Sequence, residues 1–203
     1  MTKKLLFLIL FFFAANMAFS QRFDGGALLG LNASQVEGDS FGGYKKPGIA
    51  AGFYVETDLA PAVFAAFEIK YSQKGVRKNS TEKDPTQYLM RLNYIDLPIY
   101  AGFRTNEWGA LIAGIQPGYL LSANEFNAYG EVPPEDQNEF NKFDLQVLAG
   151  FQFDIIDRLK ADLRLAFSVI HISDNPGDTN YYTKDGLFNN VVTLGVYYQI
   201  GTL

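Results

Sequence analysis

The chain has 203 residues, a formal net charge of −5 at pH 7, no cysteine and a single histidine. This length fits one domain, or one domain preceded by a targeting segment. The lack of cysteine excludes disulfides and thiolate metal sites, and the acidic balance argues against nucleic acid as a partner.

Residues 1–20 are predicted to form a secretory signal peptide. Lys3 and Lys4 precede a short apolar run, and small residues follow at the expected cleavage point after Ser20. The run is shorter than the ~20 residues that a membrane-spanning helix needs. We therefore expect an exported protein whose mature domain, 21–203, has a net charge of −7, since removal of the leader takes away two lysines and no acids.

Alternation of apolar and polar residues predicts β-strands along the mature chain. Between Phe143 and Ile155 the apolar side chains occupy one face, whereas Asp144 and Asp154 lie on the other. This is the pattern of a strand with two chemically different faces. In chain order, eight strands are expected at about 24–33, 47–58, 67–72, 88–103, 108–121, 143–155, 160–169 and 192–200.

Two prolines interrupt the alternation. Pro98 lies in the fourth expected strand and Pro117 in the fifth. Because proline has no N–H to donate to the ladder, we expect β-bulges at both positions.

The connections alternate strictly between short and long, which places all the short turns at one end. The short ones are 58–61, 105–107 and 156–159; the long polar ones are 34–46, 73–87, 122–142 and 173–188. Outer-membrane barrels combine short periplasmic turns with long external loops. The predicted fold class is therefore all-β: an eight-stranded antiparallel up-and-down transmembrane β-barrel with meander topology, in the cell outer membrane, with both termini periplasmic.

The polar face indicates a membrane barrel rather than a soluble one. An eight-stranded lumen is just wide enough for side chains to fill, and mixed charges there can pair. The predicted lumen residues are Glu56, Glu68, Lys70, Asp96, Asp144, Asp154, Lys160, Asp162 and Arg164. Two aromatic girdles are expected at the membrane interfaces: Phe103, Trp108, Phe153 and Tyr198 at the short-turn end, and Tyr71, Tyr88, Tyr119 and Phe143 at the long-loop end.

Short motifs spread over nearly the whole mature chain resemble the PorT-type outer-membrane β-barrel domain. They are Gly30–Asn32, Lys46–Gly48 leading to Gly52–Glu56, Tyr71–Gly75, Leu92–Ile99, Gly114–Leu121 and Phe140–Asp144. The resemblance implies an OmpX-like eight-stranded barrel inserted by the outer-membrane assembly machinery. One member of that family is linked to gliding-type secretion. The chain departs from the usual barrel terminus, which is aromatic, because it ends on Leu203.

Candidate chemistry is sparse. His171 lies near Ser168, Ser173 and Asp174, but catalysis by a triad needs the base to meet both the nucleophile and the acid, and neighbours on one strand point to opposite faces. The preferred interpretation is a histidine at the rim of the barrel and a protein that is not an enzyme. We expect no catalytic, cofactor-binding or metal-binding residues and no cofactor; a calcium site at Asp174, Asp178 and Asp185 is the weaker alternative.

The two middle loops differ in charge. The second carries Lys74, Arg77, Lys78 and Lys83 with Glu82 and Asp84, and the third carries Glu125, Glu131, Glu135, Asp136 and Glu139. Both are interpreted first as solvated external loops, although the basic loop could contact lipopolysaccharide phosphates and the acidic loop a partner.

Three functions are carried forward. The first is a non-enzymatic monomer with a filled polar lumen, acting in structure, adhesion or envelope interaction through four long external loops. The second is an accessory component of a secretion or gliding apparatus, and the third is an acyltransferase- or lipase-like enzyme that uses His171. Expected partners are outer-membrane lipid and lipopolysaccharide, the assembly machinery during biogenesis and an envelope protein at the loops. A general porin would need about twice as many strands.

Overall fold

The computed structural model describes residues 22–39, 41–82, 84–174 and 186–202, and the predicted signal peptide lies outside them. The described part is almost entirely strand. The strands are β1 (Phe23–Glu37), β2 (Lys46–Ala60), β3 (Val63–Lys78), β4 (Tyr88–Asp96), β5 (Ile99–Arg104), β6 (Gly109–Asn127), β7 (Gly130–Glu131), β8 (Phe143–Ile156), β9 (Leu159–Ser168) and β10 (Phe188–Thr202), with one 3₁₀ turn at Pro134–Asp136. Within the described residues, no helix has the length and apolar character needed to cross a membrane.

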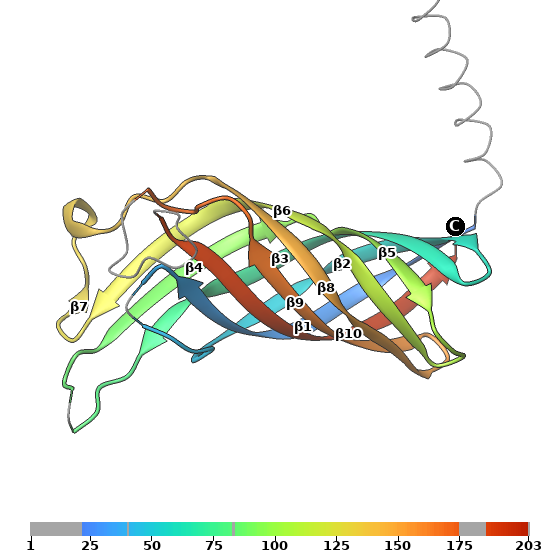
Figure 1. Ribbon diagram of the computed structural model, residues 1–203, viewed down its shortest axis with the longest axis horizontal. Coiled ribbons are helices and arrows are strands. Elements are labelled where there is room, and N and C mark those ends of the chain that lie inside the picture. Colours follow the sequence, from blue (N-terminus) through green and yellow to red (C-terminus); the bar gives the residue numbers. More distant parts are fainter. Residues whose placement is uncertain (1–21, 40, 83, 175–185, 203) are drawn as a thin grey trace, which may run out of the picture.

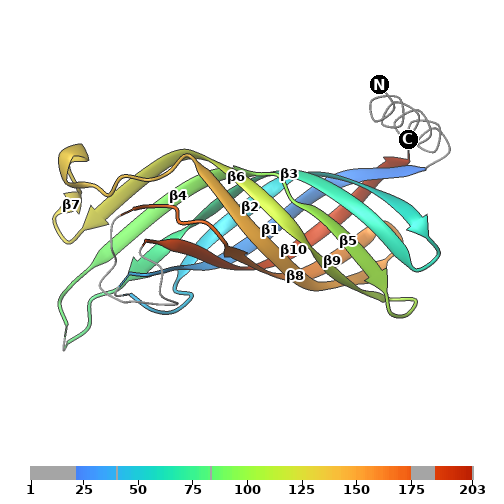
Figure 2. The same cartoon turned by 45° about the horizontal axis from the view of Figure 1, so that its top comes forward.

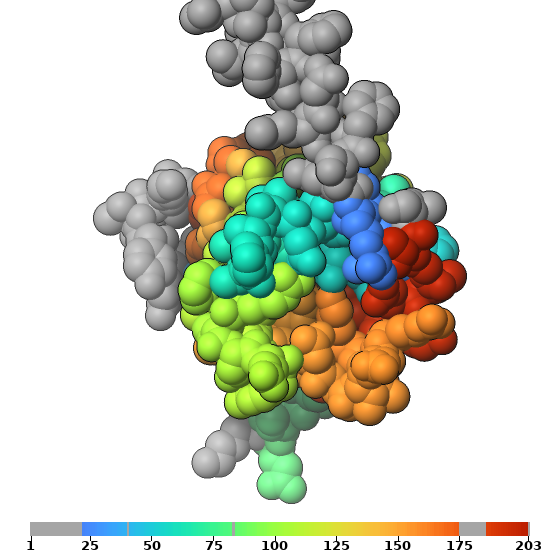
Figure 3. Space-filling view, turned by 90° about the vertical axis from the view of Figure 1, so that its right-hand side faces the viewer, coloured from blue at the N-terminus to red at the C-terminus, as the bar shows by residue number. Residues whose placement is uncertain are grey.

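The strands form a closed antiparallel ring, which confirms the predicted fold class. Each strand pairs with its neighbour in sequence, β4 and β5 together act as one strand between β3 and β6, and β1 pairs with β10 from Asp24↔Thr202 to Glu37↔Phe188. The strands cross the long axis at a steep tilt (Figures 1 and 2). The view onto the short-turn end shows β1 beside β10, where the ring closes (Figure 3).

Pro98 and Pro117 do not produce the expected bulges. β3 keeps one register across Pro98, from Lys70↔Asp96 to Phe67↔Ile99, and the β6–β8 register is continuous through Pro117. Pro98 lies opposite Glu68, and Pro117 lies opposite Leu97. Two other residues at such positions would exchange two hydrogen bonds, but each proline can only accept one. The Glu68 N–H donates to the Pro98 carbonyl, and the Leu97 N–H donates to the Pro117 carbonyl. The missing hydrogen bonds separate β4 from β5 at Leu97 and Pro98, but they do not shift the register.

The one bulge near this region lies higher, at Leu121. Asn93 pairs with Ser122 and Tyr94 with Leu120, so Leu121 is an extra residue on β6. Leu121 and Ser122 therefore both face outward, and the inward positions above the bulge are Ala123 and Glu125.

Most strands extend further than predicted at the long-loop end, so the first three loops are shorter than predicted, whereas the fourth is longer because β9 ends at Ser168. The connections observed there are 38–45, 79–87, 128–142 and 169–187, the third containing β7 and the 3₁₀ turn. The short turns lie at the opposite end, as predicted; the β8–β9 turn is two residues long and has Arg158 at a positive φ of 67°.

Large apolar side chains cover the outside of the wall. Leu29, Phe53, Ile69, Ile115 and Leu194 are each about half exposed or more, although they come from five different strands. Such a surface is stable only against hydrocarbon.

We expect a charge on this face to destabilise the barrel in proportion to its depth. Ile115→Arg, in the middle of β6, should lower the free energy of unfolding by about 2–4 kcal/mol, whereas Ser122→Arg, outward on the same strand above the apolar zone, should cost about 0–1 kcal/mol. Denaturant unfolding in lipid vesicles measures both. Equal losses would contradict the placement of the bilayer.

Candidate functional site

The lumen is filled by a network of charged side chains centred on Arg164 of β9. Its guanidinium binds Glu68 of β3 through both nitrogens, at 3.0 and 3.1 Å, and also donates to Asp162 at 2.5 Å and to the hydroxyl of Tyr197 at 3.0 Å. The Tyr197 hydroxyl donates to Glu68, and the guanidinium stacks over Tyr100 at 4.7 Å. Four strands are thereby joined across the interior.

A second network lies next to the first and is centred on Lys74. The ammonium donates to Asp96 at 2.9 Å and to Gln146 at 2.7 Å, and lies 3.6 Å from Asp144. Gln116 bridges Asp96 and Gln146, at 3.0 and 2.6 Å. These side chains are at most 3 % exposed, so the network is buried inside the barrel.

The prediction of the lumen residues was largely correct. Glu56, Glu68, Lys70, Asp96, Asp144, Asp162 and Arg164 are all buried inside, and Lys160 pairs with Glu56 at the short-turn mouth. Asp154 lies at the same mouth but is exposed. The prediction placed Lys74 in an external loop, which is wrong: it is on β3, and its ammonium is one of the central lumen charges.

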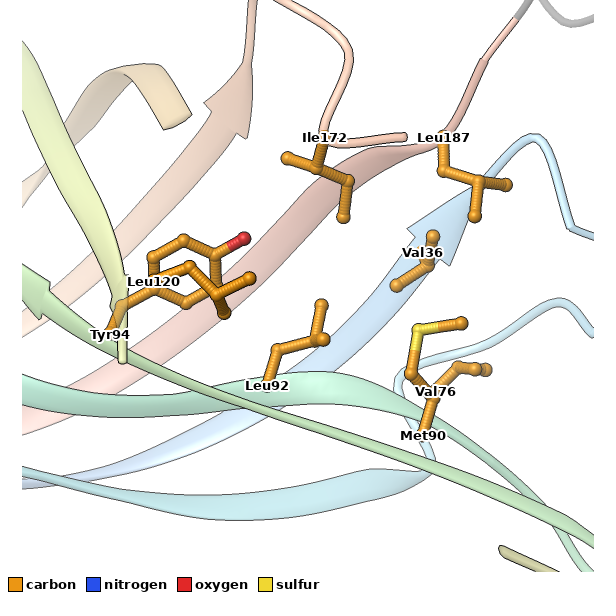
Figure 4. Close-up of a cluster of buried hydrophobic side chains, with 8 residues drawn as sticks. All are labelled: Val36, Val76, Met90, Leu92, Tyr94, Leu120, Ile172 and Leu187. Carbon is orange, nitrogen blue, oxygen red and sulfur yellow. The ribbon is translucent and has the colours of Figure 1, made fainter. Parts of the chain in front are cut away.

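Above the charged zone the interior becomes apolar, which the sequence analysis did not predict. Eight buried side chains from four strands and the last loop point toward one another (Figure 4): Val36, Val76, Met90, Leu92, Tyr94, Leu120, Ile172 and Leu187. Phe41, Tyr88 and Phe140 pack against this cluster, so residues of the first and third loops are held down on it. We call it the apolar plug.

At the height of the apolar plug, the outer face of the barrel changes from apolar to polar. On β3 the outward residues run from Phe67 and Ile69 through Tyr71 to Gln73 and Arg77. Neighbouring strands do the same, with hydrogen bonds from Tyr71 and Gln73 to Asn93 and from Asn93 to Ser122. The upper barrel therefore has a polar exterior and an apolar interior, as a protein surrounded by water would.

The aromatic girdles are observed with one exception. Trp108 stacks on Phe153 at the short-turn end, with ring centroids 6.1 Å apart, and Tyr119 meets Phe143 at the other end at 5.4 Å. Tyr88 was assigned to the outer girdle, which is wrong: it faces inward, and its hydroxyl donates to Glu125 at 2.6 Å.

Glu125 was assigned to an acidic loop, but it lies on β6 and is 3 % exposed. Besides the Tyr88 hydroxyl, it accepts hydrogen bonds from the backbone and side chain of Asn138, both at 2.9 Å. It thus fastens the third loop to the wall. The other acids of that loop, Glu131, Glu135, Asp136 and Glu139, are exposed, and Lys83 lies outside the described residues.

His171 pairs with Asp174, at 2.7 Å between Nε2 and Oδ1, and both side chains are solvent-exposed. The Ser168 hydroxyl instead donates to Asp144 inside the lumen at 2.7 Å, and that of Ser173 donates to the Glu139 carbonyl at 2.7 Å. The structure thus brings His171 together with Asp174, whereas the hydroxyls of Ser168 and Ser173 donate to other groups. In the described ranges, no group of three or more His, Asp or Glu side chains is arranged to hold a metal, and Asp178 and Asp185 lie outside those ranges.

The lumen network gives a prediction for stability. Arg164→Met leaves Glu68 and Asp162 buried without their main cation, and we expect it to lower the free energy of unfolding by about 3–5 kcal/mol. Adding Glu68→Gln should restore part of this loss. Arg104→Met, which removes an exposed ion pair with Asp58 at the mouth, should cost at most about 1 kcal/mol. Unfolding in detergent micelles compares them; similar losses for Arg104→Met and Arg164→Met would refute the central role of the network.

Asp39 in the first loop gives a prediction for pH. Burial raises the pKa of its carboxyl to about 6, although the N–H of Phe41 donates to it and acts in the opposite direction. The unfolded group titrates near 3.8, so the folded loop binds more protons between about pH 4 and 6 and loses stability as the pH rises through that window. Above it the contribution is constant.

Asp39→Asn keeps an oxygen for the Phe41 N–H but cannot ionise. We therefore expect the protection of first-loop amides from hydrogen exchange to fall between pH 4 and 6 in the wild type and to stay level in the variant, after correction for the intrinsic exchange rate. Identical profiles for the two proteins would show that Asp39 does not titrate in this range.

The comparisons with known proteins agree with the barrel architecture. Residues 14–174 match the family described as outer membrane protein beta-barrel domain. Neisserial surface protein A is 12 % identical, with 88 % of this chain and 97 % of that chain covered and a TM-score of 0.51. Ail, the attachment invasion locus protein of Yersinia pestis, is 15 % identical, with 87 % and 98 % covered and a TM-score of 0.48. No curated protein matches. Since the family match spans most of the chain, the protein belongs to the outer membrane β-barrel domain family.

Proposed function

We propose that this protein is a non-enzymatic barrel of the outer membrane that holds an external or envelope partner at its loop end. The observation that carries this proposal is the upper barrel, where the wall continues beyond the apolar zone with a polar exterior and the apolar plug inside. A wall that only crossed the bilayer would not need this extension. The extension raises the loops on a rigid base.

The third loop is the best candidate for contact. The base of this loop is fixed by Glu125 and by contacts with the apolar plug. Tyr129 at its tip is fully exposed, and Glu131 beside it is exposed as well. An aromatic side chain on a supported loop can contribute contact area at low entropic cost. An adhesion-type or structural role is consistent with this arrangement.

The lumen supports the non-enzymatic part of the proposal. Its charges are engaged with one another, and His171 at the rim pairs with Asp174, with both side chains exposed to solvent. Contacts with outer-membrane lipid and lipopolysaccharide, and with the assembly machinery during biogenesis, complete the proposed set of partners for a monomeric barrel.

Site-specific photo-crosslinking in intact cells tests the proposal. A photoreactive residue in place of Tyr129 should capture a protein partner, whereas one in place of Asp157 in the short β8–β9 turn serves as the matched control at the other end. Heat-modifiable gel migration verifies that both variants form closed barrels. Capture from position 157 alone would refute the external role.

The second candidate is an accessory role in a secretion or gliding apparatus, which the motifs resembling the PorT-type domain favour. Lys74, Asp96, Gln116 and Asp144 of the lumen network all lie within those motifs. The motifs therefore support a common barrel architecture more than a common loop function. Loss of secretion in a deletion strain, together with capture of an apparatus protein from position 157, would favour this candidate.

A further inference from the structure

Two arginines stand side by side on the outer face of the upper barrel. Arg91 of β4 pairs with Gly75 of β3, and Arg77 pairs with Leu89, so the two arginines are diagonal neighbours on adjacent strands. Diagonal positions are about 7–8 Å apart, within reach for long side chains. Both are exposed; Arg91 lies over the Phe126 ring at 5.7 Å, and Arg77 donates to Asn79 at 2.9 Å.

A third cation lies in the wall beside them. Lys46 of β2 is only 2 % exposed, and its ammonium donates to the Pro47 carbonyl at 3.2 Å. The Lys46 side chain passes close to Gly75, where a Cβ would meet the Met90 carbonyl oxygen and would lie 3.2 Å from Lys46. Lys46 is close enough to Arg77 and Arg91 for their charges to repel its own.

None of these three cations forms an ion pair with a carboxylate in the described part of the chain, whose basic residues otherwise often do. The neighbouring Lys78 shows the contrast, since it pairs with Asp84 at 2.6 Å. Placing like charges together and burying one of them without an acid is unfavourable. In a chain with an excess of acidic residues, such a group indicates an external anion.

We propose that Arg77 and Arg91, with Lys46 behind them, bind a phosphate group of the lipopolysaccharide in the outer leaflet. Guanidinium groups bind phosphate through paired hydrogen bonds, and two diagonal arginines can hold one phosphate between them. Lys46 strengthens the positive potential from within the wall.

The height of the pair selects this ligand over a dissolved anion. On the outward face of β4, Arg91 lies four residues beyond Ile95 toward the loop end, with Asn93 between them and Leu89 beyond it. At about 3.3 Å per residue and a tilt of about 40°, this is about 10 Å along the membrane normal. Long side chains can fold back over part of that distance, which places the guanidinium groups among lipid phosphates. The inference rests on the outer-membrane location and is independent of any protein partner.

Lipid A binding by the barrel reconstituted in nanodiscs of a zwitterionic phospholipid tests the site. The added ligand is bisphosphorylated lipid A or the same lipid after removal of both phosphates. We expect the wild type to prefer the phosphorylated lipid by about tenfold or more, and the double variant Arg77→Gln/Arg91→Gln to lose that preference. Arg22→Gln, at the short-turn end, is the matched control and should keep it. Lys46→Met should reduce the preference by a smaller factor, about two- to fivefold, because it acts through charge without direct contact.

Heat-modifiable migration shows that each variant is folded before it is compared. A wild type that does not distinguish the two lipids, or a double variant that distinguishes them as well as the wild type does, would overturn the assignment. Displacement of lipid A by millimolar inorganic phosphate would overturn the choice of a lipid ligand. Since crosslinking from position 129 does not involve these arginines, failure here and failure of the proposed function are separable.

Discussion

The structure depends on the pairing of buried charges within a narrow ring. Hydrocarbon surrounds the wall, so backbone groups must pair between strands and the inward side chains must pair with one another. Arg164 and Lys74 meet this need by each engaging several strands at once. The lumen charges therefore act as cross-links between strands that lie far apart in sequence, and they leave the interior occupied by protein.

The alternation of residues was sufficient to predict the wall, because a period of two fixes which side chains face inward wherever the pairing holds. Glu68, Asp162 and Arg164 were placed correctly on that basis alone. The pattern could not show where the bilayer ends. Polar outward residues such as Gln73 made the upper part of β3 look like a loop, and Lys74 was consequently misplaced.

Similar limits explain the other differences. Tyr88 and Met90 face an apolar interior that exists only because several strands and three loops meet there, and no single segment of the sequence contains that information. The Leu121 bulge depends on how β6 meets β4, whereas Pro98 and Pro117, the residues that suggested bulges, each cost one hydrogen bond and leave the register intact. The diagonal placement of Arg77 next to Arg91 likewise follows from the register between β3 and β4.

The reversal of polarity along single strands also fixes how deep the barrel sits. If the barrel sank, Gln73, Asn93 and Ser122 would enter hydrocarbon; if it rose, Tyr71 and Ile95 would leave it. Either displacement raises the free energy, so the hydrophobic thickness of the bilayer sets one preferred position. A leaflet of different thickness would then have to deform around the wall rather than shift it, and the external loops would keep a constant height above the lipid.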